Sequence, residues 1–347
     1  MRIFYWSPVV LVPATIALEF AHAPAALIFV ASAVAIVPLA GLMGIATEEM
    51  AARTGPTIGG LMNATLGNAA EVIIGIFALR AGLIELVKAS LTGSIIGNLL
   101  LILGLSLFVG GLGRQTQTFN RQAAGMNAAL LALAVVGLVV PALFDFTHPR
   151  GKPIILAELS IAVGIVLLAV YVLSLVFSLK THRELFRPKH AHEPPKWSLR
   201  RALTLLVVAT ALVAWLSEIL VGVTEATIAD LGVSELFLGV IIIPLVGNAA
   251  EHGAAVMMAA KNKMDLSFAI AVGSSTQIAL FVAPLMIFIS LLVGNPMDLA
   301  FTAFEVTAVA LSVGVVVVIS LDGESNWLEG AQLLAVYGIL AAAFFFF

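Results

Sequence analysis

The sequence predicts an all-α polytopic membrane protein with about 11 transmembrane helices. Of its 347 residues, 61% are hydrophobic and 11% are charged, and the mean hydropathy is +1.11. Soluble domains carry about 25% charged residues, so this much apolar surface requires lipid rather than one globular core. Apolar runs recur along the whole chain, each near the roughly 17–25 residues that a spanning helix needs.

The apolar runs divide the chain into eleven predicted spanning segments. They cover residues 7–21, 24–46, 56–79, 89–113, 123–144, 154–179, 202–221, 236–259, 267–293, 299–321 and 327–347. The first run is short and contains Pro13, Glu19 and His22, which makes it the least typical of a spanning helix.

The distribution of basic residues predicts the orientation of these segments. Cytoplasmic loops of membrane proteins carry an excess of Lys and Arg. With the N-terminus placed in the cytoplasm, 13 of the 17 basic residues fall on the cytoplasmic side, and only Arg80, Lys88, Arg150 and Lys152 fall outside. The N-terminus is therefore predicted to be cytoplasmic and the C-terminus external.

The pentapeptide Gly-Asn-Ala-Ala-Glu occurs twice inside these apolar segments, at residues 67–71 and 247–251. The alignment continues at the same offset of 180 into the next segment, where Gly93-Ser94 matches Gly273-Ser274. The two copies lie on the third and eighth segments, so the repeat unit holds five helices. Because five is odd, the second copy is expected to be inverted, an architecture that recurs in secondary transporters.

The repeat therefore predicts a division of the chain into four parts. Residues 1–22 form an extra first helix, 23–179 a five-helix repeat, 180–201 a cytoplasmic linker, and 202–347 a second five-helix repeat. The linker is basic and contains His182, His190 and His192. Weak metal binding there is one reading, and a solvated loop is the more common one.

The repeated motif places a carboxylate and an amide on one helix face at mid-membrane depth. Each glutamate is residue 16 of its 24-residue segment, and a carboxylate at that depth is costly enough to indicate function. Residues three apart on a helix are neighbours, and the Gly-Asn steps favour helix breaks whose freed carbonyls can line a cavity. The predicted metal ligands are Glu71, Glu251, Asn68 and Asn248, with backbone oxygens near Gly67 and Gly247.

This set of ligands contains oxygen and no sulfur, because the chain has no cysteine. Such a set suits a hard cation such as calcium, which takes 6–8 oxygen ligands. Without the cation, two neighbouring carboxylates repel each other and lack solvation, and both effects favour protonation. Competition between a divalent cation and protons for the same carboxylates is a mechanism for antiport.

Polar residues near the motifs are candidates for the ion pathway and for proton handling. They are Ser94, Ser274, Gln277 and His252. Packing between helices is the alternative role, since small and polar residues often mediate contacts in membranes. Glu305 and Glu218 are also intramembrane carboxylates, but neither is duplicated, so helix contacts explain them equally well.

At these residues the sequence resembles the calcium/proton exchanger (CAX) family of the calcium/cation antiporter superfamily. The resemblance covers nearly the whole chain. Its main motifs are TEEMAARTG (47–55), GGLMNATLGNAAEVIIG (59–75), GNAAEHGAAVMMAAKNKMDLS (247–267), GSSTQIALFVAP (273–284), FEVTAVALSV (304–313) and DGESNWLEG (322–330). The linker departs from the acidic segment that many members carry, so regulation by such a segment is not expected here.

The resemblance implies ten core helices in two inverted halves and a calcium ion bound at Glu71 and Glu251. It also implies exchange of cytosolic calcium for protons and assembly as a homotrimer. Calcium and protons are then the substrates and the bilayer is the environment, with no resident cofactor, no enzyme activity and no nucleic-acid partner expected. The short N-terminus favours a prokaryotic cell membrane.

Other functions remain open at this point. A sodium-coupled calcium exchanger, or an exchanger for another divalent cation such as manganese, would use the same fold. An intramembrane metalloprotease is disfavoured because no His-Glu-x-x-His pattern occurs. A channel is disfavoured because inverted repeats with titratable midplane residues suit alternating access better than an open pore.

Overall fold

The computed structural model describes residues 2–148, 153–185 and 195–347, and nearly all of these residues are helical. His190 and His192 of the linker lie outside the described residues. The first half contains α1 (Arg2–Phe20), α2 (Ala25–Leu66), α3 (Ala69–Arg80), α4 (Ile84–Ile96), the π-helical η1 (Gly97–Ile102), α5 (Leu103–Gly111), β1 (Gln117–Thr118), α6 (Arg121–Thr147), α7 (Pro153–Val176), the π-helical η2 (Phe177–Thr181) and the 3-10 turn η3 (Arg183–Leu185).

The second half begins after the linker and contains a similar succession of helices. It comprises α8 (Leu199–Gly222), α9 (Thr224–Leu231), α10 (Glu235–Phe237), the π-helical η4 (Leu238–Ile242), α11 (Ile243–Gly247), α12 (Ala249–Ala260), α13 (Met264–Gln277), the π-helical η5 (Ile278–Val282), α14 (Ala283–Val293), α15 (Ala303–Ile319), β2 (Glu324–Ser325) and α16 (Trp327–Phe346).

The described ranges contain seven helices that are long and apolar enough to cross a membrane. An eighth candidate is a bent pair, Thr224–Leu231 with Glu235–Gly247, whose two parts meet at 115°. Trp6–Phe20 and Ala303–Ile319 are shorter apolar helices. The predicted class, an all-α polytopic membrane protein, is confirmed, and the count of eleven spans stays a prediction.

The N-terminal part of the fold differs from the predicted segments 24–46 and 56–79. The helix α2 continues without a break for 42 residues, to Leu66. Residues 47–55, which separate the two predicted segments, are helical too, and Glu, Met, Ala and Arg among them are all good helix formers. At 1.5 Å per residue α2 is about 63 Å long, so it extends well beyond a hydrocarbon core of about 30 Å.

The two copies of the repeat fold alike around the GNAAE motifs. The bounds of α3 and α12 differ by the offset of 180, and so do the first residues of α4 and α13. The turns that follow α3 and α12 each contain a left-handed residue at matching positions, Gly82 (φ 79°) and Asn262 (φ 59°). Both helices close with the same 6→1 bond, Leu83 N to Ala78 O and Lys263 N to Met258 O, each 2.9 Å.

Hydrogen bonds between loops define two ends of the molecule. At the linker end, β1 pairs with β2, and the backbone N–H of Asn120 donates to Asp265 Oδ1 at 2.6 Å. At the far end, Asn295 Nδ2 donates to Leu79 O at 2.7 Å, which joins the segment 294–302 to α3. The run α4–η1–α5 therefore goes from the far end to the linker end, and α13–η5–α14 goes the opposite way, as an inverted repeat requires.

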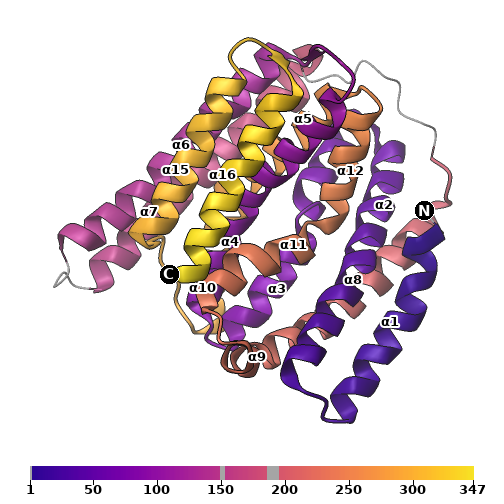
Figure 1. The fold of residues 1–347 in the computed structure, drawn as a ribbon, viewed down its shortest axis with the longest axis vertical. Helices are drawn as coiled ribbons and strands as arrows, with labels where there is room; N and C mark the ends of the chain where they lie inside the picture. Colours follow the sequence, from indigo (N-terminus) through magenta and orange to yellow (C-terminus); the bar gives the residue numbers. More distant parts are fainter. Residues whose placement is uncertain (1, 149–152, 186–194) are drawn as a thin grey trace.

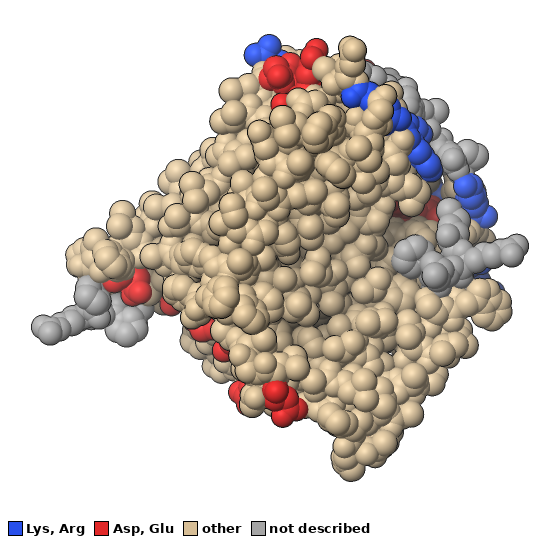
Figure 2. Space-filling model, viewed as in Figure 1, with Lys and Arg blue, Asp and Glu red and all other residues tan. Residues whose placement is uncertain are grey.

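The charges differ between these two ends. Figure 2 shows Lys and Arg at the top and along the upper right edge of the molecule, whereas Asp and Glu lie along the lower left edge and also at the top. Among the basic side chains that the structure describes, only Arg80 and Lys88 belong to the far end. By the positive-inside rule this asymmetry favours a cytoplasmic linker end.

The helices α3, α4, α11 and α12, which carry the repeated motifs and their neighbours, lie at the centre of the molecule (Figure 1). The long helices α2 and α8 lie side by side on one flank, and α6, α7 and α15 form the opposite flank. This arrangement buries Asn68 and Asn248, whereas Glu71 and Glu251 remain partly exposed.

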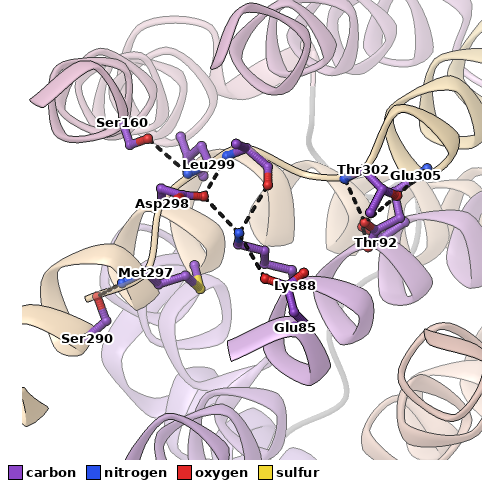
Figure 3. Close-up of polar contacts among 11 residues, drawn as sticks. Glu85, Lys88, Thr92, Ser160, Ser290, Met297, Asp298, Leu299, Thr302 and Glu305 are labelled. Atoms are coloured by element: carbon purple, nitrogen blue, oxygen red, sulfur yellow. Dashed lines mark hydrogen bonds and ion pairs between the residues drawn. The ribbon is translucent and has the colours of Figure 1, made fainter. Parts of the chain in front are cut away.

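A buried lysine fastens α4 to the segment 294–302 at the far end (Figure 3). Lys88 is 5% exposed, and its ammonium donates to Asp298 Oδ1 (2.8 Å), Ala300 O (3.1 Å) and Glu85 Oε1 (3.3 Å). All three ammonium protons are therefore used. One turn further along α4, Thr92 donates to Glu305 Oε1 at 3.2 Å, so α4 is attached to α15 as well.

Glu305 is thus a structural carboxylate at the N-terminus of α15. Its Oε2 accepts from the backbone N–H (2.9 Å) and the hydroxyl (2.8 Å) of Thr302, which completes a capping box. These hydrogen bonds agree with the prediction that Glu305 makes contacts between helices.

We expect Lys88→Met to destabilise the protein, because it leaves Asp298 at the far end without its cation. Breaking a buried ion pair typically costs 3–5 kcal/mol; since Asp298 is 31% exposed, solvent screening reduces this to about 2 kcal/mol. Thermal unfolding in detergent measures the loss. Lys261→Met, at an exposed position of the linker end, is the control, and equal melting temperatures of the two variants would contradict the prediction.

Candidate functional site

Each copy of the repeated motif lies at a break between two helices. The first break separates α2 from α3 at Gly67-Asn68, and the second separates α11 from α12 at Asn248. The two asparagines adopt nearly the same backbone conformation, with φ of −95° in both and ψ of 23° and 4°. At the second break, the carbonyl of Pro244 accepts from both the backbone N–H (3.0 Å) and the Nδ2 (3.2 Å) of Asn248.

Each glutamate packs against the glycine of the other motif. A Cβ atom placed on Gly247 would lie 3.2 Å from Cγ and 3.5 Å from Oε1 of Glu71, and one placed on Gly67 would lie 3.5 Å from Oε1 of Glu251. Because glycine has no side chain, each carboxylate can approach the opposite backbone closely. The structure thus brings the two glutamates and the two glycines together in one place.

The amide of Asn68 joins the first motif to the second half of the chain. Its Nδ2 donates to Gln277 Oε1 at 2.7 Å, and its Oδ1 accepts from Ser274 Oγ at 3.2 Å. Ser274 Oγ in turn accepts from Asn98 Nδ2 at 3.2 Å, and Asn98 Oδ1 lies 3.2 Å from His252 Nε2. One chain of side-chain contacts therefore crosses between the halves four times.

The amide of Asn248 makes the reciprocal connection to the first half. Its Nδ2 donates to Ser94 Oγ at 3.1 Å. Ser94 and Ser274 occupy matching positions of the repeat, so each motif's asparagine contacts the serine of the opposite half. All ten residues named in the sequence as site or pathway candidates thus lie in one connected region, and their roles stay predictions.

Three oxygen atoms in this region are buried without a hydrogen-bond partner among the described residues. They are Oε2 of Glu71, Oε2 of Glu251 and Oδ1 of Asn248. Leaving a buried acceptor unsatisfied costs about 1–3 kcal/mol, and more for a charged group. When both side chains are charged, Glu251 also repels Glu71. A bound cation or a proton would relieve both penalties.

The chemistry of these atoms fits a divalent cation with oxygen ligands. In the described ranges no cluster of three or more His, Asp and Glu side chains is present, so acidic groups alone cannot complete a shell of 6–8 oxygens. Two carboxylates would balance two positive charges. The remaining ligands would come from amide oxygens, backbone carbonyls at the breaks, and water.

Asn98 also belongs to the network, although it was not among the predicted site residues. It contacts both Ser274 and His252. It lies in η1, and η5 occupies the matching place in the second half. The sequence feature that could have identified Asn98 is a polar amide side chain within an apolar segment. Glu218 and Glu305 form no part of this network among the described contacts.

Comparison with known proteins gives a family for the chain. A family model described as sodium/calcium exchanger protein matches residues 24–180 and 201–346. The Ca(2+)/H(+) antiporter of Synechocystis sp. is 48% identical, and the match covers 92% of this chain and 91% of the relative. The Ca(2+)/H(+) antiporter ChaA of Bacillus subtilis is 46% identical over 99% of both chains.

Solved structures show the same fold. Native YfkE superposes with a TM-score of 0.88 at 43% identity, over 99% of this chain and 100% of that chain. The H+/Ca2+ exchanger CAX superposes with a TM-score of 0.71 over 98% of this chain and 91% of that chain; its identity is only 18%, so it supports the fold alone. The chain is therefore an integral membrane protein of the sodium/calcium exchanger protein family, which belongs to the calcium/cation antiporter superfamily.

Proposed function

We propose that this protein is a secondary antiporter that exchanges calcium for protons by alternating access, with Glu71 and Glu251 binding either one calcium ion or protons. The observation that carries the proposal is the pair of carboxylates, each with an unpartnered buried oxygen, packed against the opposite glycine. The relatives named as Ca(2+)/H(+) antiporters at 46–48% identity support the same substrates.

The proposed cycle follows from the charges at the site. With calcium bound, the two carboxylates neutralise the ion, and Asn68, Asn248 and carbonyls at the breaks supply further oxygens. When calcium leaves, protons replace it, because two bare carboxylates would repel each other in a poorly solvated place. The site is therefore neutral in both states, and a neutral site can be carried across the membrane at lower cost.

One feature favours protons over sodium as the coupling ion. His252, beside Glu251 in sequence, contacts the network through Asn98. A sodium-coupled calcium exchanger, or an exchanger for manganese, is the alternative on the same fold.

The orientation and assembly are further parts of the proposal. The concentration of basic residues at the linker end supports a cytoplasmic N-terminus and an external C-terminus, in a prokaryotic cell membrane. Assembly as a homotrimer is proposed from the family resemblance, and cross-linking in native membranes tests it.

We expect Glu71→Gln and Glu251→Gln each to weaken calcium binding by at least about tenfold, or roughly 1.4 kcal/mol. Glutamine keeps the size of the side chain but removes the charge that balances the ion. Equilibrium calcium binding in detergent and calcium-driven proton movement in proteoliposomes measure the effect. Glu324→Gln, at an exposed position in β2, is the control. Normal exchange by either site variant would contradict the paired-carboxylate mechanism.

We expect Gly247→Ala to lower calcium affinity by about tenfold, because the new methyl group would press on Glu71 at about 3.2 Å. Gly253→Ala is a matched control on α12: a Cβ placed there meets no atom within 4 Å. Calcium titration of both purified variants measures the difference. Equal affinities would show that close approach of Glu71 to Gly247 is not needed for binding.

We expect calcium uptake into proteoliposomes to proceed with a pH gradient and no sodium. Calcium added to the purified, weakly buffered protein should also release protons, and the affinity for calcium should rise with pH, because each bound proton must leave before the metal binds. A pH electrode measures the release. Uptake that requires sodium, or binding without proton release, would favour the alternative exchanger.

A further inference from the structure

A narrow pocket lies beside Glu71, between α3, α4, α11, η5 and α14. The pocket extends along α3 from Glu71 to Ala78 and along α4 from Ser94 back to Leu86. Both directions lead from the site toward the far end of the molecule. Glu251 is absent from the lining, so this pocket meets only one of the two carboxylates.

The polar groups in the pocket are few and form a single line. Glu71, Ser90 and Ser94 are its polar lining residues, and all other members of the lining are apolar or glycine. Ser90 and Ser94 are four residues apart on α4 and therefore lie on one face. Ser94 Oγ accepts from Asn248, and in the described part of the chain neither serine hydroxyl donates a hydrogen bond. Both hydroxyls are free to bond water in the pocket.

Hydrogen bonds position one wall of the pocket, and a close packing contact positions the other. On the far side of α4, Lys88 and Thr92 attach the helix to the segment 294–302 and to Glu305 (Figure 3). On the side of α3, Gly75 lies so close to Met286 that a Cβ atom placed on it would be 3.0 Å from Sδ. The width of the pocket beside Met286 therefore depends on the absence of a side chain at Gly75.

The second half of the chain does not repeat these residues. At the offset of 180, Gly75 corresponds to Ala255 and Ser90 corresponds to Ile270. A methyl group and a branched aliphatic chain thus replace the open space and the hydroxyl. The difference lies in the positions that shape the pocket, while the motifs themselves are identical.

We propose that this pocket is a one-sided access route through which water and protons, but not hydrated calcium, reach Glu71 from the far end. A calcium ion needs 6–8 oxygen ligands along its path, and this route offers two hydroxyls and one carboxylate. Water needs only two to four polar partners. The assignment of protons rests on the proposed exchange function, whereas the access of water to Glu71 does not.

The absence of cysteine from the chain allows a direct test with single cysteines. Ser90→Cys is expected to react with silver ion at least about tenfold faster than with a bulky quaternary-ammonium thiosulfonate. Ala81→Cys, in the exposed turn at the far end, should react readily with both reagents. Ile270→Cys is the matched position of the repeat and should react with silver at least about tenfold more slowly than Ser90→Cys. If the Ser90→Cys thiol did not react with silver ion, or reacted at equal rates with both reagents, the proposal would be overturned.

A second variant separates the route from the binding site. Ser90→Leu, which fills the pocket, is expected to slow calcium-driven proton movement by about tenfold while equilibrium calcium affinity stays unchanged. Ile270→Leu should alter neither quantity. Weaker calcium binding in Ser90→Leu, or an unchanged rate, would contradict a water-sized route. If the unmodified protein exchanged no calcium for protons, the proposed function would fail, but the silver reaction would still report whether water reaches the pocket.

Discussion

Two glutamates, each packed against the glycine of the opposite motif, set the constraint on which the rest of this structure depends. A carboxylate in the membrane interior is unfavourable unless neighbouring groups or a bound ion compensate it. Here Glu71 lies against Gly247 and Glu251 lies near Gly67, so neither carboxylate is placed without the other half. The helix breaks, the reciprocal asparagine contacts and the surrounding helices all serve to keep these groups together.

The contacts at the two ends show how the halves are held in register. At the far end Lys88 fastens α4 to the segment before α15, and at the linker end Asp265 receives the backbone N–H of Asn120. Glu49 on α2 accepts the N–H groups of Lys196 (2.7 Å) and Trp197 (2.9 Å), which attaches the end of the linker to the first half. A displacement of either half would disturb these bonds and the amide network together.

Sequence reasoning predicted the centre of the molecule better than its periphery. The duplicated GNAAE motifs predicted the breaks and the proximity of Glu71 and Glu251, because identical residues at one offset reflect one repeated structure. The continuity of α2 was not predicted, because the charged residues at 47–55 interrupt the apolar pattern. Several of these residues nevertheless have a high helix propensity. The contact of Asn98 with His252 and the pocket at Gly75 depend on packing between distant segments, which no local pattern reports.

The exchange of contacts between halves also has a consequence for how the protein is made. Every partner that Asn68 contacts through its side chain lies more than 200 residues later in the chain. At roughly 5–20 residues per second, the first motif waits about 10–40 seconds in the membrane before Ser274 and Gln277 are synthesised. During that interval Glu71 has neither Gly247 nor the second carboxylate beside it. Insertion of the first half must therefore be tolerated with an incomplete site, and a protonated, uncharged Glu71 is the form that the bilayer accepts at least cost.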